Sequence, residues 1–361
     1  MNCIKATARR DRLHIVDLSA GPLSVRVCPT RGMGILSAHF RGIRLGWNSP
    51  VGEVVHPRDV NLKKDKGTGW LEGFSEFIVR CGLSSMGAPG PDRVTSPEGV
   101  IRTDHLTLHG RIANLPASRV TSAPEIGPNK RIYASGRVVE SGPHGSCLEL
   151  NARVELVQRP CGFRIVDRVV NRGKYPAELQ LLYHCNFGPP ILEADSRLLA
   201  PVEQVAGRDA RSRRAIAALD RNFAPRSGFR EQVYFMRLKG NRRGRTIAAL
   251  CNAAGDLAVS LQFSLESLPC LTLWRQLGGK GEWYVVGIEP GTAFPNHRSL
   301  ERSHGRVPVL APGEERLFEL DVRLHHGPAA ISRLEQAITR IGARREIVPL
   351  SELHSGKEAI G

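Results

Sequence analysis

The chain has 361 residues, enough for one large domain or two of ordinary size. Apolar residues make up 41% and charged residues 24%, a composition that is typical of globular proteins and excludes global disorder. No apolar stretch approaches the roughly 18–20 residues that span a bilayer, and the polar, basic start lacks the apolar core of a secretory signal. We therefore expect a cytoplasmic protein that has no membrane partner.

The formal net charge is +16, and arginine supplies most of it. A charge of this size raises the question of a nucleic-acid partner. The arginines are spread along the whole chain, however, and only 6% of residues are aromatic, with no base-stacking motif. The densest cluster, Arg208–Arg214, is more typical of a solvated loop. Binding to nucleic acid or to an acidic partner stays an alternative that the charge pattern disfavours.

The eight cysteines are scattered, without a C-x-x-C pair or zinc-finger spacing, so we expect free thiols rather than a disulfide framework. Asp104, His105 and His109 lie close in sequence, but no neighbouring residue completes a metal site. The chain has no phosphate-binding loop, no nucleophile elbow and no dinucleotide-binding glycine motif. We expect neither a metal nor a cofactor.

Apolar and polar residues alternate with a period of two along much of the chain. The clearest runs are residues 23–27, 148–156, 163–170 and 317–324, each of which predicts a strand with one buried face. A helical spacing of apolar residues is clear only over 329–341. Many short strands with few, short helices predict an all-β fold, a large sandwich of antiparallel strands.

The chain shows no internal repeat and reads as a single domain over residues 1–350. Residues 60–66 are expected to form a helical turn or a loop. The arginine-rich stretch 203–231 looks like a loop-rich insertion over one face, and the polar residues 351–361 look like a frayed tail.

Four irregular segments interrupt the alternating pattern, and functional residues tend to lie in such segments. The first contains Trp70 and Phe74, with Arg80 shortly after them. An aromatic ring can stack on the C–H face of a sugar while an arginine binds its hydroxyls. A packed loop with a structural arginine is the alternative.

The second and third segments each contain a histidine at the end of a strand-like run. His109 is followed by a glycine, which lets the backbone turn or a ligand approach closely. His184 and Asn186 come just before a Gly-Pro-Pro breaker, which predicts two polar groups at the rim of a sheet. Taken alone, each histidine is more often a structural residue.

The fourth segment places Glu289 at the end of an apolar run, immediately before a Pro-Gly turn. A carboxylate in such a place is partly desolvated, which raises its pKa and makes it a usable base. Shortly upstream, Trp274 ends another apolar run and offers a stacking ring, with Arg275 and Gln276 as two polar arms.

The ordered set of motifs resembles the aldose 1-epimerase (galactose mutarotase-like) superfamily, and within it a divergent branch of aldose-epimerase-like proteins of unknown function. The motifs are GWLEGF, RCGLSSMGAPG, LHGRIANLP, YHCNFG, GIEPGTAFPN and LAPGEERLFEL, which extend from about residue 20 to 325. The resemblance implies a single sugar-binding domain with a galactose mutarotase-like β-supersandwich fold. A monosaccharide would bind on its concave face, without a cofactor.

The resemblance also implies roles for single residues. In mutarotases a glutamate takes the proton from the anomeric hydroxyl and a histidine protonates the ring oxygen, so that the ring opens and recloses as the other anomer. Glu289 matches this base, and His184 with Asn186 matches the acid motif. His109 matches an earlier histidine that orients the sugar, and Arg80 matches a sugar-binding arginine.

Several alternatives remain open. The superfamily's sugar-gripping aspartate could correspond to Asp220 or Asp256. A non-catalytic sugar-binding or sensing protein on the same fold is the main alternative to an isomerase of carbohydrate metabolism. A polysaccharide lyase on this fold is a further possibility that no residue set favours. The identity of the sugar stays open, and either a monomer or a homodimer is expected.

Overall fold

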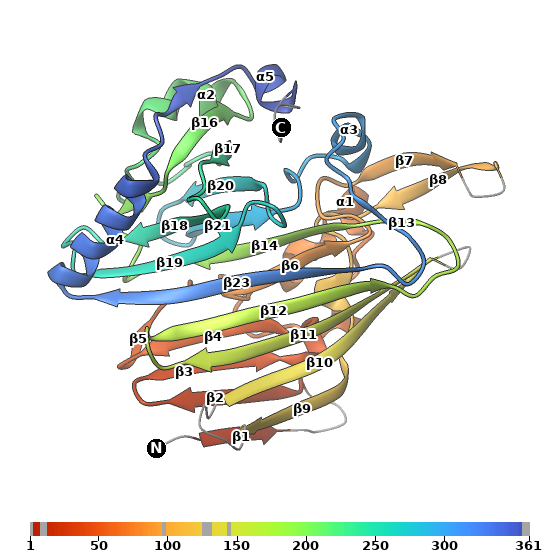
Figure 1. The fold of residues 1–361 in the computed structure, drawn as a ribbon, viewed down its shortest axis with the longest axis horizontal. Helices are drawn as coiled ribbons and strands as arrows, with labels where there is room; N and C mark the ends of the chain where they lie inside the picture. The colour runs from red at the N-terminus through yellow and green to blue at the C-terminus, as the bar shows by residue number, and fades with distance from the viewer. Residues whose placement is uncertain (1–2, 8–12, 96–98, 125–131, 143–145, 356–361) are drawn as a thin grey trace.

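Two large β-sheets lie face to face in the computed structural model, which describes residues 3–7, 13–95, 99–124, 132–142 and 146–355 (Figure 1). The larger sheet has twelve strands within these ranges. Its order is β1 (Cys3–Thr7), β2 (Ile15–Ala20), β3 (Leu23–Cys28), β4 (Gly34–Phe40), β6 (Ile78–Leu83), β14 (Gln180–Phe187), β21 (Tyr284–Gly291), β20 (Cys270–Leu277), β17 (Gln232–Leu238), β16 (Val202–Gly207) and β24 (Glu346–Ile347), with β5 (Ile43–Arg44) beside β4.

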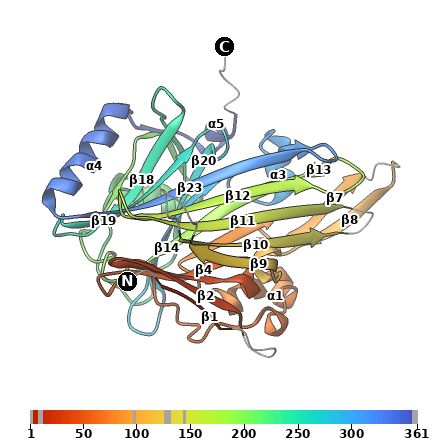
Figure 2. The same ribbon diagram turned by 60° about the horizontal axis from the view of Figure 1, so that its bottom comes forward.

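The smaller sheet has eight strands in the described part of the chain and covers one face of the larger sheet (Figure 2). Its order is β15 (Arg197–Leu199), β18 (Arg245–Cys251), β19 (Leu257–Ser264), β23 (Glu315–His326), β12 (Gly162–Asn171), β11 (Cys147–Val157), β10 (Ile132–Ser141) and β9 (Ser118–Pro124). Two separate pairs complete the strands, β7 (Gly90–Thr95) with β8 (Ile101–Leu106) and β13 (Ala177–Glu178) with β22 (Val309–Leu310).

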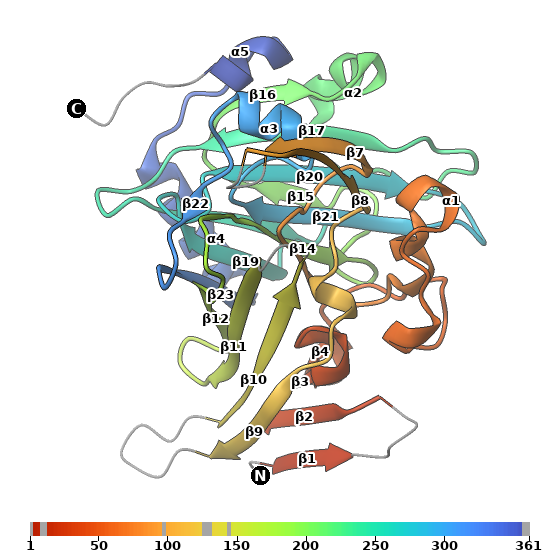
Figure 3. The same cartoon turned by 90° about the vertical axis from the view of Figure 1, so that its right-hand side faces the viewer.

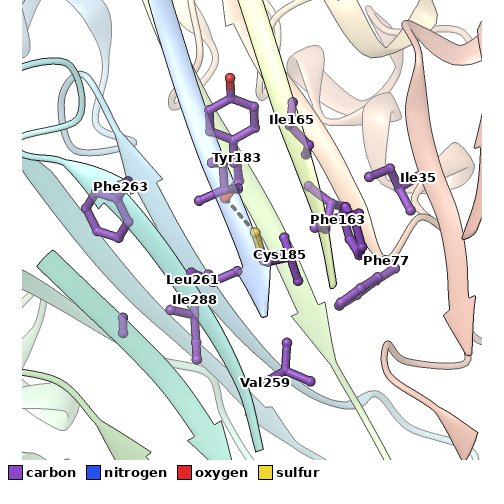
Figure 4. Packing of buried hydrophobic residues seen from close by; sticks show 14 of the residues in the cluster. Ile35, Phe77, Phe163, Ile165, Tyr183, Cys185, Val259, Leu261, Phe263 and Ile288 are labelled. Carbon is purple, nitrogen blue, oxygen red and sulfur yellow. Dashed lines mark hydrogen bonds between the residues drawn. The ribbon is translucent and has the colours of Figure 1, made fainter. Parts of the chain in front are cut away.

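The main hydrophobic core fills the space between the two sheets. Figure 4 shows its centre, where Tyr183 and Cys185 of the larger sheet approach Phe163 and Ile165 of the smaller one. Phe77 joins the sheets, because its ring lies edge-on to that of Phe163 with 6.4 Å between centroids. Burying a large apolar side chain in this way stabilises a fold by roughly 1.5–3 kcal/mol.

The alternating runs of the sequence are strands of these sheets. The expected strands over 23–27, 148–156, 163–170 and 317–324 are β3, β11, β12 and β23. The expected helix over 329–341 is α4 (Pro328–Ile341), which buries Ile331 and Leu334 against the smaller sheet. The prediction of an all-β sandwich with antiparallel strands is confirmed, since the one parallel pair among the described strands of the sheets is β16 with β24.

Short helices lie between the strands. They are α1 (Lys64–Gly67), α2 (Ala210–Ala215), α3 (Arg298–Ser303), α5 (Leu350–Ser355), and the 3-10 helices η1 (Pro29–Arg31), η2 (Pro57–Asp59), η3 (Gly69–Gly73), η4 (Ile112–Asn114) and η6 (Ile216–Ala218). The segment 60–66, expected to be a helical turn or a loop, contains the start of α1. Figure 3 shows α2 and α5 beside β16, at the same end of the molecule as α3.

Two expectations differ from the structure. The segment 203–231 is not an insertion, because it begins with β16, a strand of the larger sheet, and continues into α2. The expected polar tail from residue 351 begins with most of α5, whose Leu353 is fully buried, while residues 356–361 lie outside the described residues. Among the described helices, none is both long and apolar enough to cross a membrane.

Candidate active site

Three neighbouring strands of the larger sheet place polar residues on one face. His184 lies on β14, Glu289 on β21 and Trp274 on β20. Adjacent residues of the same strands, such as Tyr183 and Ile288, face the core between the sheets. Because side chains alternate along a strand, His184 and Glu289 face the opposite side. We call this side, turned away from the smaller sheet, the outer face.

His184 and Glu289 are in direct contact. The imidazole Nε2 of His184 lies 3.1 Å from Oε1 of Glu289, and the two residues are only 4% and 2% exposed. Burial lowers the pKa of His184 well below its ordinary value, and the nearby His109 adds to this effect. Burial raises the pKa of Glu289 well above its ordinary value. Both shifts favour the neutral form of each group over an ion pair.

Gly287 makes room for the Glu289 carboxyl group. A Cβ atom at this position would lie 2.5 Å from Oε1 of Glu289, 3.1 Å from Cε1 of His184 and 3.3 Å from Cε3 of Trp274. Such a short distance to a side-chain oxygen is not tolerated without a shift. The carboxyl group thus lies over bare backbone, between an imidazole and an indole.

His109 reaches the same cluster from a turn that follows β8. Its backbone has a left-handed φ of 58°, which is uncommon outside glycine, and its amide donates to the carbonyl of Gly87 at 3.0 Å. Its Nδ1 lies 3.0 Å from the carbonyl oxygen of Met86. Burial lowers the pKa of His109 to about 4, so the ring is neutral. Its centroid is 5.4 Å from that of His184 and 4.5 Å from that of Trp70.

All four tryptophans of the chain gather around Phe74 on this face. Trp70 and Trp47 have ring centroids 4.5 Å and 4.9 Å from that of Phe74. Trp283 and Trp274 follow at 5.8 Å and 6.2 Å. An aromatic wall of this kind offers faces on which the C–H groups of a sugar can stack.

Several buried polar atoms around the cluster have no hydrogen-bond partner. They are Nε1 of Trp70, Nδ1 of His184, Oδ1 of Asn186, Oγ1 of Thr272 and Oε1 of Glu289. A buried polar group without a partner costs about 1–3 kcal/mol. A hydroxyl-rich ligand, or ordered water, would supply the missing partners. The concentration of such atoms at one place marks this cluster as the candidate site.

Two arginines expected at the site are elsewhere. Arg80 is fully buried between the sheets, where Nε and Nη2 donate to the carboxylate of Asp167 at 2.5 and 2.8 Å. Arg275 also faces the interior, and its Nε donates to Oδ1 of Asn222 at 3.0 Å. Each arginine is next in sequence to a residue on the outer face. Because side chains alternate along a strand, its own side chain lies on the other side of the sheet. The structure therefore does not bring Arg80 and Arg275 to the outer face with the other expected site residues.

The other expected residues reach the outer face. Asn186 lies beside His184, and its Nδ2 donates to the carbonyl of Glu76 at 3.0 Å. Gln276 is farther from the cluster, and its amide donates to the carbonyl of Phe229 at 3.1 Å. The structure thus brings together Glu289, His184, His109, Asn186, Trp70 and Trp274.

An acidic residue at the site was missed. Oε2 of Glu231 accepts a hydrogen bond from the indole Nε1 of Trp274 at 2.9 Å, and Oε1 accepts from Nη2 of Arg208 at 2.5 Å. No local pattern marks Glu231, which precedes β17 in an arginine-rich loop. The two aspartates considered from the sequence have other partners: Asp220 pairs with Arg345 and Asp256 accepts from Asn252.

A family model matches residues 12–324, most of the chain, and its description is domain of unknown function, DUF4432. The chain belongs to the DUF4432 family. A comparison with functionally curated proteins gives no significant match to this DUF4432 protein.

Solved structures relate the DUF4432 fold to sugar epimerases. A protein from Klebsiella pneumoniae, proposed to be an aldose 1-epimerase, is 34% identical with a TM-score of 0.86 over 95% of this chain and 87% of its own. A galactose mutarotase-like protein from Clostridium acetobutylicum is 16% identical with a TM-score of 0.62, over 90% of this chain and 99% of its own. The galactose 1-epimerase from Lactobacillus acidophilus is 13% identical with a TM-score of 0.56, over 91% and 99%.

These similarities confirm the fold and the family expected from the sequence. The DUF4432 protein has a galactose mutarotase-like β-sandwich and is a divergent aldose-epimerase-like protein. The last two structures share too little sequence to say more than that the fold is the same.

Proposed function

We propose that this DUF4432 protein is an aldose 1-epimerase, which interconverts the anomers of a monosaccharide by opening and closing its ring. The observation that carries the proposal is the 3.1 Å contact between His184 and Glu289. Mutarotation requires one group that accepts a proton and one that donates a proton at the same acetal carbon, and this pair supplies both. The aromatic wall and the unpaired polar atoms supply a surface for the sugar.

The protonation states suggest how the cycle runs. A bound sugar would donate hydrogen bonds to Glu289 and favour its carboxylate form, so that the proton moves to His184. Glu289 then takes the proton of the anomeric hydroxyl while the bond from the anomeric carbon to the ring oxygen breaks. The ring oxygen takes its proton from His184, and an aldehyde forms.

This step returns the pair to the state of the free protein, with the proton on Glu289 and a neutral His184. In the proposed cycle, the free protein and the complex with the open-chain sugar therefore have the same protonation states at His184 and Glu289. Rotation of the aldehyde group and the same steps in reverse give the other anomer. His109, held by the Met86 carbonyl, would orient the sugar and need not exchange a proton.

An exchange experiment tests the proposal. Two-dimensional NMR exchange spectroscopy on a panel of common aldoses measures anomer interconversion with and without the protein. We expect acceleration for at least one sugar, and a loss of about 10²–10⁴-fold in Glu289→Gln. The control is Glu319→Gln, a half-exposed glutamate on β23 of the other sheet. Absence of acceleration for every aldose, or full activity in Glu289→Gln, would refute the proposal.

The closed state of the site favours a second candidate function, a sugar-binding or sensing protein. His184 and Glu289 are almost inaccessible in the described structure, and a sensor would bind its sugar and hold it. Isothermal titration calorimetry that detects binding, together with unchanged anomer exchange, would favour the sensor. The free thiols at Cys28, Cys81, Cys185, Cys251 and Cys270 support a reducing compartment such as the cytoplasm for either function.

A further inference from the structure

Trp274 joins the inner part of the site to its rim. At one end, its ring lies 5.4 Å from that of His184, centroid to centroid, and borders the space over Gly287 that holds the Glu289 carboxyl group. At the other end, its indole N–H donates to Glu231 at 2.9 Å. The hydrogen bond to Glu231 therefore anchors the N–H edge of the indole at the rim.

Glu231 is itself held by Arg208. Nη2 of Arg208 donates to Oε1 of Glu231 at 2.5 Å. The same Nη2 lies 3.9 Å from Oδ2 of Asp209. The backbone amide of Arg208 donates to the carbonyl of Val233 at 2.9 Å, which fixes the residue beside β17. The side chains of Arg208 and Glu231 are 39% and 45% exposed, so this ion pair borders the solvent.

The pair also acts on Glu289 through its charges. The titratable or charged groups that contact Glu289 or interact with it electrostatically are His184 and Cys185 of β14, Cys81 of β6, His109, Glu231 and Arg208. Burial keeps both imidazoles and both thiols neutral at pH 7. Of these groups, Glu231 and Arg208 therefore carry the charges that Glu289 experiences.

We infer that the Arg208–Glu231 ion pair is a positioning and electrostatic control element of the Glu289–His184 pair, coupled to it through the Trp274 indole. An effect of the ion pair on the rate of anomer exchange rests on the proposed function. The coupling to Glu289 itself is a property of the ligand-free protein. Glu231 and Arg208 act through Trp274 and through space, and neither needs to touch the reacting atoms.

The two residues have opposite effects. The negative charge of Glu231 raises the pKa of Glu289, and the positive charge of Arg208 lowers it. Glu231→Gln keeps one acceptor oxygen for the Trp274 N–H, and it removes the charge and the second acceptor that binds Arg208. Glu231→Ala removes both and leaves the indole N–H without its partner. An ion pair without this coupling would shift the pKa of Glu289 in neither variant.

The test is an NMR titration of the full-length, ligand-free protein labelled at its glutamate side-chain carboxyl carbons. We expect the titration midpoint of Glu289 to fall in Glu231→Gln and to rise in Arg208→Gln. The indole resonance of Trp274 should keep its position in Glu231→Gln and move in Glu231→Ala. The control is the Arg197–Glu335 ion pair, which is similarly exposed at 44% and 39%; Arg197→Gln and Glu335→Gln should change neither signal.

Thermal unfolding of each variant verifies that it is folded before its midpoint is interpreted. Unchanged midpoints in both variants, or shifts in the same direction, would overturn the inference. Its failure is distinguishable from that of the proposed function. Opposite midpoint shifts in a protein without anomer exchange would support the coupling and refute the epimerase. Normal anomer exchange with unshifted titration midpoints would support the epimerase and refute the coupling.

Discussion

Nε2 of His184 lies 3.1 Å from Oε1 of Glu289, in a place where both side chains are almost fully buried. An isolated buried charge would be very costly there, so burial favours the neutral form of both groups in the free protein. A proton donor and a proton acceptor thus lie side by side, and the free energy of burying two charges is avoided. A polar ligand that stabilises the carboxylate is what separates them into charged forms.

Glu289 is predicted to make the folded protein less stable at alkaline pH. Burial raises its pKa above the ordinary value, which is about 4.3. The folded chain thus keeps a proton that the unfolded chain releases. This contribution to stability is complete below about pH 4.3 and is lost as the pH rises toward the folded pKa. The loss is about 1.4 kcal/mol for each pH unit that separates the folded pKa from the unfolded one.

Glu289→Gln removes this dependence. Its melting temperature should exceed that of the unchanged protein at pH 8, and the difference should shrink toward pH 4. Differential scanning calorimetry at several pH values measures it, with Glu319→Gln as the exposed control. A difference that stays constant between pH 4 and pH 8 would show that Glu289 is not protonated in the folded protein.

Gly287→Ala should abolish most of the activity while the protein stays folded. The added Cβ would lie 2.5 Å from Oε1 of Glu289 and displace the carboxyl group. A displacement of about 1 Å can reduce catalysis by about 10²-fold. The backbone at Gly287 is not left-handed, so alanine fits the strand conformation. Anomer exchange and circular dichroism are the measurements, and full activity in the folded variant would contradict the geometry.

Arg80→Met should affect stability rather than sugar affinity. Arg80 is paired with Asp167 inside the core, where loss of one partner leaves an uncompensated charge and costs about 3–5 kcal/mol. The control is Arg26→Met, because Arg26 pairs with Asp17 at the surface and should contribute less than about 1 kcal/mol. Urea unfolding measures both. A stable Arg80→Met protein with weakened sugar binding would return Arg80 to the site.

The sequence predicted the architecture because alternation is clear wherever one face of a strand is exposed. In β14 every residue is buried, and in β6 as well. Strands buried on both faces show no alternation that could tell which side a residue faces. The sequence therefore did not show that the side chain of Arg80 faces the core, or that Arg275, one position after Trp274, lies on the opposite side of the sheet from it. A shift of one residue reverses the face of a side chain.

The meeting of His184, Glu289 and His109 was expected from the order of their motifs, not from their spacing, since each histidine alone could have been structural. The parts of the site that escaped prediction depend on long-range pairing. Thr272 lies opposite Glu289 only through the register of β20 with β21. Glu231 and Arg208 reach Trp274 from a loop whose composition indicated only solvent exposure.

The most direct test of the account is a crystal structure of Glu289→Gln with a bound aldose. The account predicts a sugar against the aromatic wall, with its anomeric oxygen within about 3 Å of the side chain at position 289 and its ring oxygen in reach of His184. A sugar bound elsewhere on the molecule, with this cluster still closed and empty, would contradict it.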